Sequence, residues 1–152
     1  MKEVAIYTDG ACSYNPGPGG WGAILMYNGS EKRISGGDAN TTNNKMELIA
    51  VINALSCLKE QCTVRLYSDS AYVVNAFVQG WLENWKSNGW KKQNKRVKNV
   101  ELWQQLDKLV NYHQVEFIKV KGHSDNKYNN ECDKLARAEV DKLLGGSNEW
   151  KI

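Results

Sequence analysis

Residues 6–22, IYTDGACSYNPGPGGWG, decide the fold expected for this chain. The run that leads into this stretch, residues 3–9, has the β-branched and aromatic side chains of a strand, and it ends in a single acid, Asp9. A second strand-like run covers residues 20–28, and its Asn-Gly end is a strong hairpin signal. Residues 31–36 form the returning strand. The chain is therefore predicted to open with a three-stranded antiparallel meander.

Helical and strand patterns alternate along the rest of the chain. The spacing of apolar residues predicts helices at 41–60, 70–80, 99–113 and 128–144, and strands at 63–68 and 114–120. Parallel strands joined through helices would extend the meander into a five-stranded mixed sheet flanked by helices, which is an α/β fold. A basic segment at residues 80–98 is expected to hold two short helices at most. We predict a single domain over residues 1–146 and a short tail at 147–152.

Composition restricts the class of protein. The chain has 152 residues, 41% of them hydrophobic, which suits one domain with a sizeable core. There is no apolar run of the length a membrane helix needs and no signal-peptide pattern, so we expect a cytoplasmic protein. The four cysteines lack CxxC spacing and there are only two histidines, which argues against structural zinc and for free thiols. No assembly motif is visible, and a monomer is expected.

The positive charge is concentrated in the basic segment. Residues 80–98 hold six Lys/Arg and one Glu, whereas the remaining residues carry more acids than bases. The same segment contains three of the six tryptophans, Trp81, Trp85 and Trp90. Basic runs are usually solvated faces, and tryptophans usually pack a core, but a solvated face has no need of three tryptophans. The combination indicates a stiff platform that meets a polyanion.

Four acids stand at the ends of predicted elements. Asp9 ends the first strand and Asp69 follows the strand at 63–68, so parallel pairing would bring both to one edge of the sheet. Glu47 and Asp133 lie in the early parts of two helices that follow strands. Each acid alone has an ordinary explanation, as a helix-dipole, turn or cap residue, but strands are depleted in aspartate. Together they predict a cluster.

A carboxylate cluster of this kind indicates a metal site. Packed carboxylates repel one another unless a cation neutralises them, and oxygen ligands suit Mg²⁺, with Mn²⁺ as a possible substitute. Two such ions roughly 4 Å apart can hold the attacking and leaving oxygens of a phosphodiester. The GPGG run is not a phosphate loop, because no GKS or GKT follows it.

The motifs TDGACSYNPGPGGWG, TTNNKMEL, YSDSAYV and VKGHSDNKYNNECDKLA occur in this order with these gaps. In this respect the chain resembles type 1 ribonuclease H of the bacterial kind along essentially its whole length. The resemblance implies a ribonuclease H-like fold with a basic handle, and an endoribonuclease that cuts the RNA strand of RNA–DNA hybrids. It also implies divalent metal ions, two of them in the substrate complex, and products with 5′-phosphate and 3′-hydroxyl ends.

The resemblance also assigns roles to residues. It makes Asp9, Glu47, Asp69 and Asp133 the catalytic metal ligands, and His123 a mobile histidine that moves a proton. The substrate contacts that it implies beside the acids are Asn15, Asn43 and Asn44, with Cys12, Thr42 and Asn44 on the DNA-strand side. The handle, which is expected to grip the DNA strand, contributes Trp81, Trp85, Trp90, Lys86, Lys91, Lys92, Lys95, Arg96 and Lys98. His113 is expected to be structural.

Three positions depart from the family pattern. Ala71 stands where glutamine is common, Asp125 where glycine is common, and Asn130 where glutamate is common. These departures bear on the reaction rate and the metal preference.

Three alternatives to a ribonuclease stay open. They are another nuclease of the same fold, a non-catalytic binder of hybrids, and a metal-binding protein without nucleic-acid chemistry. The KGHS histidine and the handle argue against the first, the complete carboxylate set against the second, and the local positive charge against the third.

Overall fold

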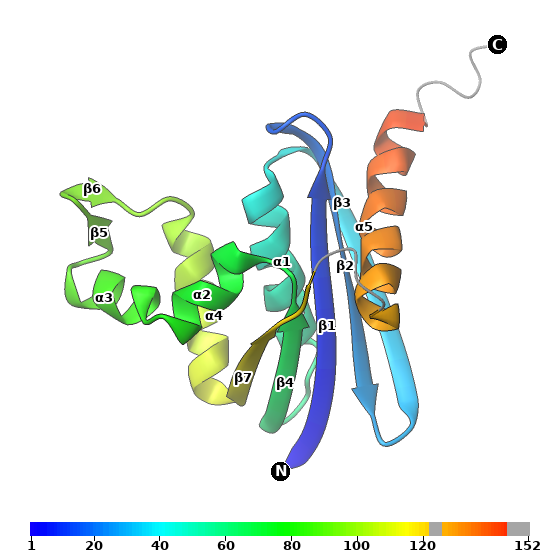
Figure 1. The fold of residues 1–152 in the computed structure, drawn as a ribbon, viewed down its shortest axis with the longest axis horizontal. Coiled ribbons are helices and arrows are strands. Elements are labelled where there is room, and N and C mark those ends of the chain that lie inside the picture. The colour runs from blue at the N-terminus through cyan, green and yellow to red at the C-terminus, as the bar shows by residue number, and fades with distance from the viewer. Residues whose placement is uncertain (122–125, 146–152) are drawn as a thin grey trace.

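The computed structural model describes residues 1–121 and 126–145, and the predicted tail at 147–152 lies outside the described residues. Its main sheet has five strands in the order β3-β2-β1-β4-β7 (Figure 1). The strands are β1 (Lys2–Cys12), β2 (Gly17–Tyr27), β3 (Ser30–Thr41), β4 (Cys62–Ser68) and β7 (Gln114–Lys119). The helices are α1 (Asn43–Ser56), α2 (Ala71–Val78), α3 (Trp81–Ser87), α4 (Val100–Tyr112) and α5 (Lys127–Gly145). The predicted α/β class is confirmed.

The opening meander forms as predicted. Strands β1, β2 and β3 pair antiparallel, and Tyr27 pairs with Ser30 across a two-residue turn. Both turn residues, Asn28 and Gly29, have positive φ, which matches the twist of the strands. All three strands are longer than predicted, because the glycine-rich stretch after residue 16 pairs as strand rather than forming a loop. Strand β4 then pairs parallel to β1, and β7 parallel to β4.

Helices cover both faces of the sheet, and glycines set how closely they approach. Helix α1 packs on one face, where a Cβ at Gly10 would lie 2.6 Å from the Glu47 backbone nitrogen. Helix α5 packs on the other face, where a Cβ at Gly20 would lie 2.2 Å from the Ala136 carbonyl oxygen (Figure 1). These two close contacts fix the first turns of α1 and the middle of α5 against β1 and β2. They therefore position the acids that those helices carry.

The main hydrophobic core lies between the sheet and helices α1, α2 and α4. Trp103 of α4 is fully buried there, against Tyr72 and Trp85. His113 is also buried and accepts a hydrogen bond at Nδ1 from the Cys62 amide (3.1 Å), and burial lowers its pKa. It ties the end of α4 to the start of β4, as its predicted structural role requires. None of the helices in the described part of the chain is long and apolar enough to cross a membrane.

The handle differs from the prediction, which allowed short helices and no strand. It contains one helix, α3, followed by the two-residue strands β5 (Lys91–Lys92) and β6 (Lys95–Arg96), which pair antiparallel. The turn between them places Gln93 and Asn94 at positive φ. Two residues at positive φ suit a tight hairpin, but Gln-Asn is a weaker turn signal than Asn-Gly, so the sequence did not reveal it.

Candidate active site

Three of the four predicted acids meet at one edge of the sheet. Asp9 lies near the end of β1, Glu47 is in the second turn of α1, and Asp69 directly follows β4. One ligand oxygen from each lies within 4.8 Å of the other two. Asp9 and Glu47 are buried, with 5% and 6% of their surface exposed, and Asp69 is half-buried. The parallel pairing of β1 and β4 produces this convergence, as the sequence predicted.

The fourth acid, Asp133 of α5, lines the same cavity but is turned towards a base. The cavity has a volume of about 420 Å³, and Asp133 closes it opposite Asn43, Asn44 and Tyr72. Its Oδ2 atom lies 2.9 Å from Nη2 of Arg137, one helical turn further along α5. The same carboxyl group also lies within hydrogen-bonding reach of Asp9, so Asp133 contacts both an acid of the cluster and a base. The spacing of four residues was the signal in the sequence that could have indicated the pair.

The acids strongly affect one another. Burial, followed by the negative charges of Asp69 and Asp133, raises the pKa of Asp9 to about 8. Burial, followed by the charges of Asp9 and Asp69, raises the pKa of Glu47 well above its ordinary value. One Glu47 oxygen, Oε1, is buried and has no hydrogen-bond partner among the described residues. A cluster of oxygens with an unsatisfied buried member suits a hard divalent cation, which would remove the repulsion and fill the missing contact.

The predicted polar contacts border this cavity. Asn43 and Asn44 are exposed in the first turn of α1 and line it. Thr42 caps α1, its hydroxyl accepting from the Lys45 amide (3.2 Å), and Asn15 Oδ1 accepts from the Asn43 amide (3.0 Å). The capping types in the sequence predicted where this helix begins.

Cys12, a predicted DNA contact, is half-buried at the end of β1. Its sulfur lies 3.4 Å from the carbonyl oxygen of Thr41 and 3.6 Å from those of Tyr14 and Gly17. A thiol is a weak donor, and this one ends β1 beside the loop that joins β1 to β2. Its contacts hold that loop against the end of β3.

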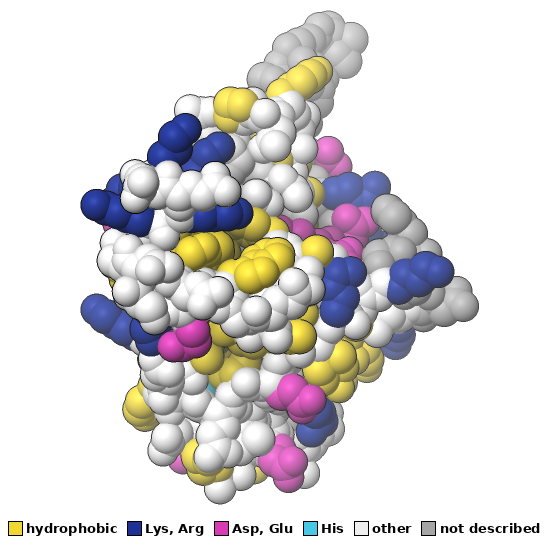
Figure 2. Space-filling model, turned by 60° about the vertical axis from the view of Figure 1, so that its left-hand side comes forward, with side chains coloured by type: hydrophobic (Ala, Val, Ile, Leu, Met, Phe, Trp, Pro, Cys, Tyr) yellow, Lys and Arg dark blue, Asp and Glu magenta, His cyan; other side chains and the backbone are white. Residues whose placement is uncertain are grey.

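The handle presents its cations around an aromatic hollow. Trp81, Trp85, Lys91 and Lys92 line a cavity of about 670 Å³ together with Tyr72. Figure 2 looks onto this side, where dark-blue basic side chains surround yellow hydrophobic ones. Trp85 and Trp90 pack against the main core, and Trp81 is 37% exposed.

The cations of the handle are not equivalent. Lys91, Lys92, Lys95 and Lys98 are exposed. Lys86 Nζ instead lies 3.2 Å from Oδ2 of Asp107 on α4, and Arg96 Nη2 lies 2.6 Å from Oε1 of Glu101. The Arg96 pair is exposed and easily exchanged, whereas the Lys86 pair is partly buried and ties α3 to α4.

The remaining residues singled out in the sequence are His123 and the three departures from the family pattern, Ala71, Asp125 and Asn130. His123 and Asp125 lie outside the described residues. Ala71 is exposed at the start of α2 and lines the carboxylate cavity, and Asn130 is exposed in α5, one turn before Asp133.

Sequence reasoning missed Tyr72, whose side chain borders both cavities. Its hydroxyl accepts from Asn99 Nδ2 and Trp103 Nε1, each at 3.1 Å, and so joins the acid site to the base of the handle.

Fold and site together define the class: a nuclease with the ribonuclease H-like fold, with carboxylates gathered at the carboxyl ends of β1 and β4. The family model of RNase H matches residues 1–141. Ribonuclease H of Acetivibrio thermocellus is 66% identical over 93% of this chain and 97% of its own. Ribonuclease H of Chlorobaculum parvum is 61% identical over 91% and 96%. The chain belongs to the ribonuclease H family.

Solved structures agree with this assignment. LC9-RNase H1, described as a type 1 RNase H with the type 2 active-site motif, is 28% identical, with a TM-score of 0.83 over 97% of this chain and 74% of its own. LC11-RNase H1, solved in complex with an RNA/DNA hybrid, has 24% identity and a TM-score of 0.70 over 93% and 99% of the two chains. The predicted resemblance to type 1 ribonuclease H is confirmed.

Proposed function

We propose that this chain is an endoribonuclease that hydrolyses the RNA strand of RNA–DNA hybrids and leaves 5′-phosphate and 3′-hydroxyl ends. The convergence of Asp9, Glu47 and Asp69 within 4.8 Å carries this proposal, because it supplies an all-oxygen ligand set beside an open cavity. Family membership and the structure of LC11-RNase H1 with its hybrid support the substrate class. We also propose that the working unit is a monomeric domain of residues 1–146 that acts in the cytoplasm.

Asp9, Glu47, Asp69 and Asp133 would hold the metal ions, two of them when substrate is bound. Mg²⁺ is the preferred ion and Mn²⁺ a substitute, and the ions would supply activation of water and stabilisation of the charge on the reacting phosphate. The Asp133 carboxyl group already lies within hydrogen-bonding reach of Asp9 while its Oδ2 atom pairs with Arg137, so a metal ion there would compete with this guanidinium. The buried acids Asp9 and Glu47 keep their positions because α1 is packed tightly at Gly10.

The remaining residues orient the substrate. The amides of Asn43 and Asn44, with Asn15 beside them, can bond phosphates and 2′-hydroxyl groups, and only the RNA strand offers a 2′-hydroxyl. Such contacts would decide which strand enters the carboxylate cavity. The exposed lysines of the handle would hold phosphates of the DNA strand away from the acids. His123 is proposed to carry a proton to or from the reacting oxygens.

The test is a cleavage assay with one labelled strand. The protein is given RNA–DNA hybrid, double-stranded RNA, single-stranded RNA and double-stranded DNA, with Mg²⁺, with Mn²⁺ and with EDTA. Asp69→Asn, which keeps the shape of the side chain but makes it a poor metal ligand, is compared with Asp141→Asn, which changes an exposed aspartate of α5. We expect cleavage of only the RNA of the hybrid, only with metal, in the wild type and in Asp141→Asn but not in Asp69→Asn. End labelling then identifies the 5′-phosphate.

Other results would select one of the alternatives. Binding of the hybrid without cleavage in either metal would indicate a non-catalytic binder. Cleavage of double-stranded DNA would place the chain with another nuclease of the same fold. Full activity of Asp69→Asn would remove this carboxylate from the site.

A further inference from the structure

Two large aromatic residues of the described chain, Tyr14 and Trp90, have left-handed backbone conformations, each with φ of 63°. This conformation is uncommon for residues other than glycine and is a clear outlier for a bulky side chain. Packing accounts for Trp90, which is partly buried against the core. Its amide donates to the Trp85 carbonyl (2.6 Å), and its carbonyl accepts from the Val97 amide (3.0 Å).

No comparable packing accounts for Tyr14. Its side chain is 79% exposed, the largest value among the exposed large hydrophobic residues of the described chain. Neither its ring nor its hydroxyl makes a hydrogen bond or an aromatic contact with another described residue. An unusual backbone conformation that the free protein does not use for packing indicates a role in function.

The loop that carries Tyr14 is held in place on every side. The Ser13 amide donates to the Pro18 carbonyl (2.8 Å), and Asn15 is bonded to the first residue of α1. The Cys12 sulfur lies among three carbonyl oxygens of this region, and at Gly17 a Cβ would lie 2.2 Å from the Ser13 carbonyl. A loop held in this way fixes the backbone from which the exposed ring projects, which lowers the entropy cost of a contact.

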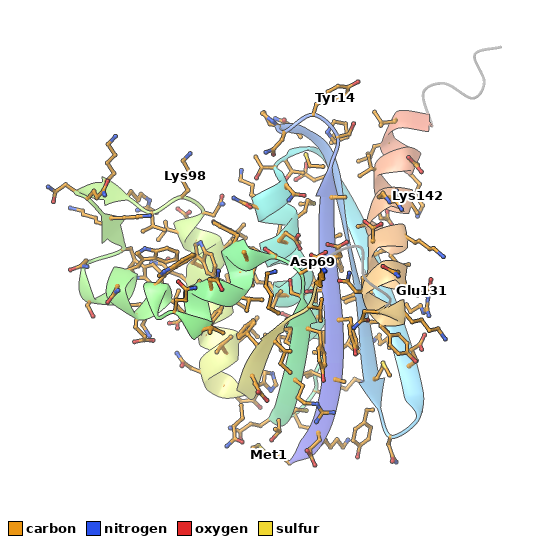
Figure 3. All side chains as sticks on the ribbon, in the orientation of Figure 1. Met1, Tyr14, Asp69, Lys98, Glu131 and Lys142 are labelled. Carbon is orange, nitrogen blue, oxygen red and sulfur yellow. The ribbon has the colours of Figure 1, made fainter. Side chains whose placement is uncertain are left out.

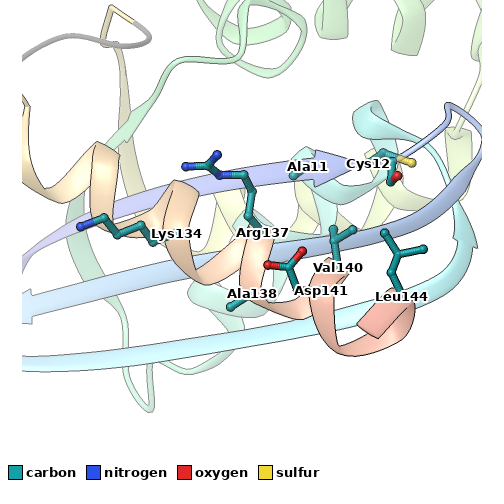
Figure 4. Close-up of a pocket in the computed structure, with 9 residues that line it drawn as sticks. Ala11, Cys12, Lys134, Arg137, Ala138, Val140, Asp141 and Leu144 are labelled. Atoms are coloured by element: carbon teal, nitrogen blue, oxygen red, sulfur yellow. The ribbon is translucent and has the colours of Figure 1, made fainter. Parts of the chain in front are cut away.

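The loop lies between two hollows. On one side Asn15 contacts Asn43, which lines the carboxylate cavity. On the other side Cys12 and Ser13 line a cavity of about 480 Å³ that faces Arg137 and Asp141 of α5 (Figure 4). Figure 3 shows Tyr14 at the tip of the loop, on the same upper edge of the molecule as Lys98 of the handle. Because Asn15, the neighbour of Tyr14, contacts Asn43 at the carboxylate cavity, a duplex bound over the acids would lie close to this loop.

We propose that Tyr14 is a substrate-contact residue, whose ring packs against sugars and base edges of the bound hybrid beside the carboxylate site. The inference rests on the proposed function and adds to it a contact outside the asparagines and the handle. Tyrosine suits the role, because its ring offers a large apolar face with a polar tip at little entropy cost. The strained backbone of the free enzyme is maintained because the ring contributes to binding.

The test compares Tyr14→Asn and Tyr14→Phe with the wild type. Asparagine tolerates the left-handed conformation, so Tyr14→Asn removes the ring and keeps the loop. Hybrid binding is measured by fluorescence anisotropy in EDTA, and cleavage in Mg²⁺ gives KM and kcat separately. For Tyr14→Asn we expect Kd and KM to rise by about 5- to 30-fold, kcat at saturating hybrid to stay unchanged, and the melting temperature to stay equal or rise. Tyr14→Phe should bind within about twofold of the wild type if the ring face makes the contact.

Each other outcome has a distinct meaning. If the wild type cleaves the hybrid and Tyr14→Asn binds as tightly, the proposal for Tyr14 is overturned and the proposed function stands. A lower melting temperature of Tyr14→Asn together with weaker binding would show a structural role for the ring, and would overturn the proposal as well. A wild type that does not cleave the hybrid would overturn the proposed function itself.

Discussion

The carboxylate cavity and the handle both concentrate charge of one sign, but they do so in opposite environments. The acids lie at the edge of the sheet, two of them buried, where the packing of α1 and the pairing of β1 with β4 hold them. The bases stand exposed on a small helix and a two-residue hairpin. Buried like charges interact strongly, whereas exposed like charges are screened by solvent. The proposed chemistry thus falls in the buried region and the proposed grip on a polyanion in the solvated one.

The largest effect is expected for a buried acid of the carboxylate cavity. Glu47→Gln should lower cleavage in Mg²⁺ by about 10³-fold or more, because an amide is a poor ligand and a metal ion contributes several kcal/mol to such a reaction. In EDTA the same change should raise the melting temperature, since it removes an acid whose ionisation is opposed by burial and by the charges of Asp9 and Asp69. Single-turnover cleavage and thermal unfolding measure both effects. Glu116→Gln, at an exposed glutamate of β7, is the control, and equal activity of the two variants would contradict the assignment.

The handle should show a smaller and salt-dependent effect. Replacing Lys91, Lys92, Lys95 and Arg96 with glutamine should weaken hybrid binding by about 10- to 100-fold and reduce the slope of log K against log salt by roughly 3. Binding titrations at several salt concentrations give this slope. A control with the same change in net charge, outside the handle, replaces Lys32, Lys59, Lys108 and Lys142. If both sets change the slope equally, the handle is not the specific grip.

The dependence of stability on pH should also separate the two regions. Asp9 holds a proton up to a pH of about 8 when folded, but only below about 4 when unfolded. Between these values the folded state binds more protons, so the free energy of unfolding falls as pH rises. In EDTA we expect the melting temperature to fall by roughly 5–10 °C between pH 5 and pH 8. Mg²⁺ or Asp9→Asn should flatten this dependence, and a fall that neither reduces would show another origin.

The smallest effect is expected where the handle meets the body of the protein. Asp107→Asn breaks the pair with Lys86, which is only partly shielded from solvent, so the melting temperature should fall by no more than about 3 °C. Because Asp107 engages the Lys86 ammonium in the free protein, its release should leave hybrid binding equal or slightly tighter. Thermal unfolding and anisotropy measure the two quantities. A marked loss of binding would show that the pair itself positions the handle for its substrate.

The sequence predicted most of the fold for physical reasons that are local. Asn28-Gly29 suits the tight turn of a hairpin, Thr42 and Ser70 cap helices, and Val100, Trp103 and Leu106 follow a helical period. It did not predict the hairpin of β5 and β6, whose turn uses Gln93 and Asn94, or the full length of β2, which depends on pairing through glycines. The single-domain assignment and the roles of the site residues stay predictions.

By itself, the sequence determined the class of the protein, because acids at the ends of two parallel strands must meet and because four motifs occur in order. Tertiary structure decided the rest. Only packing shows that Lys86 is engaged by Asp107 and that Tyr72 borders both cavities. The exposure of the Tyr14 ring and its left-handed backbone were also visible only in the structure, because both depend on how the loop is held. Such pairings join residues through space, and the order of residues along a chain does not specify them.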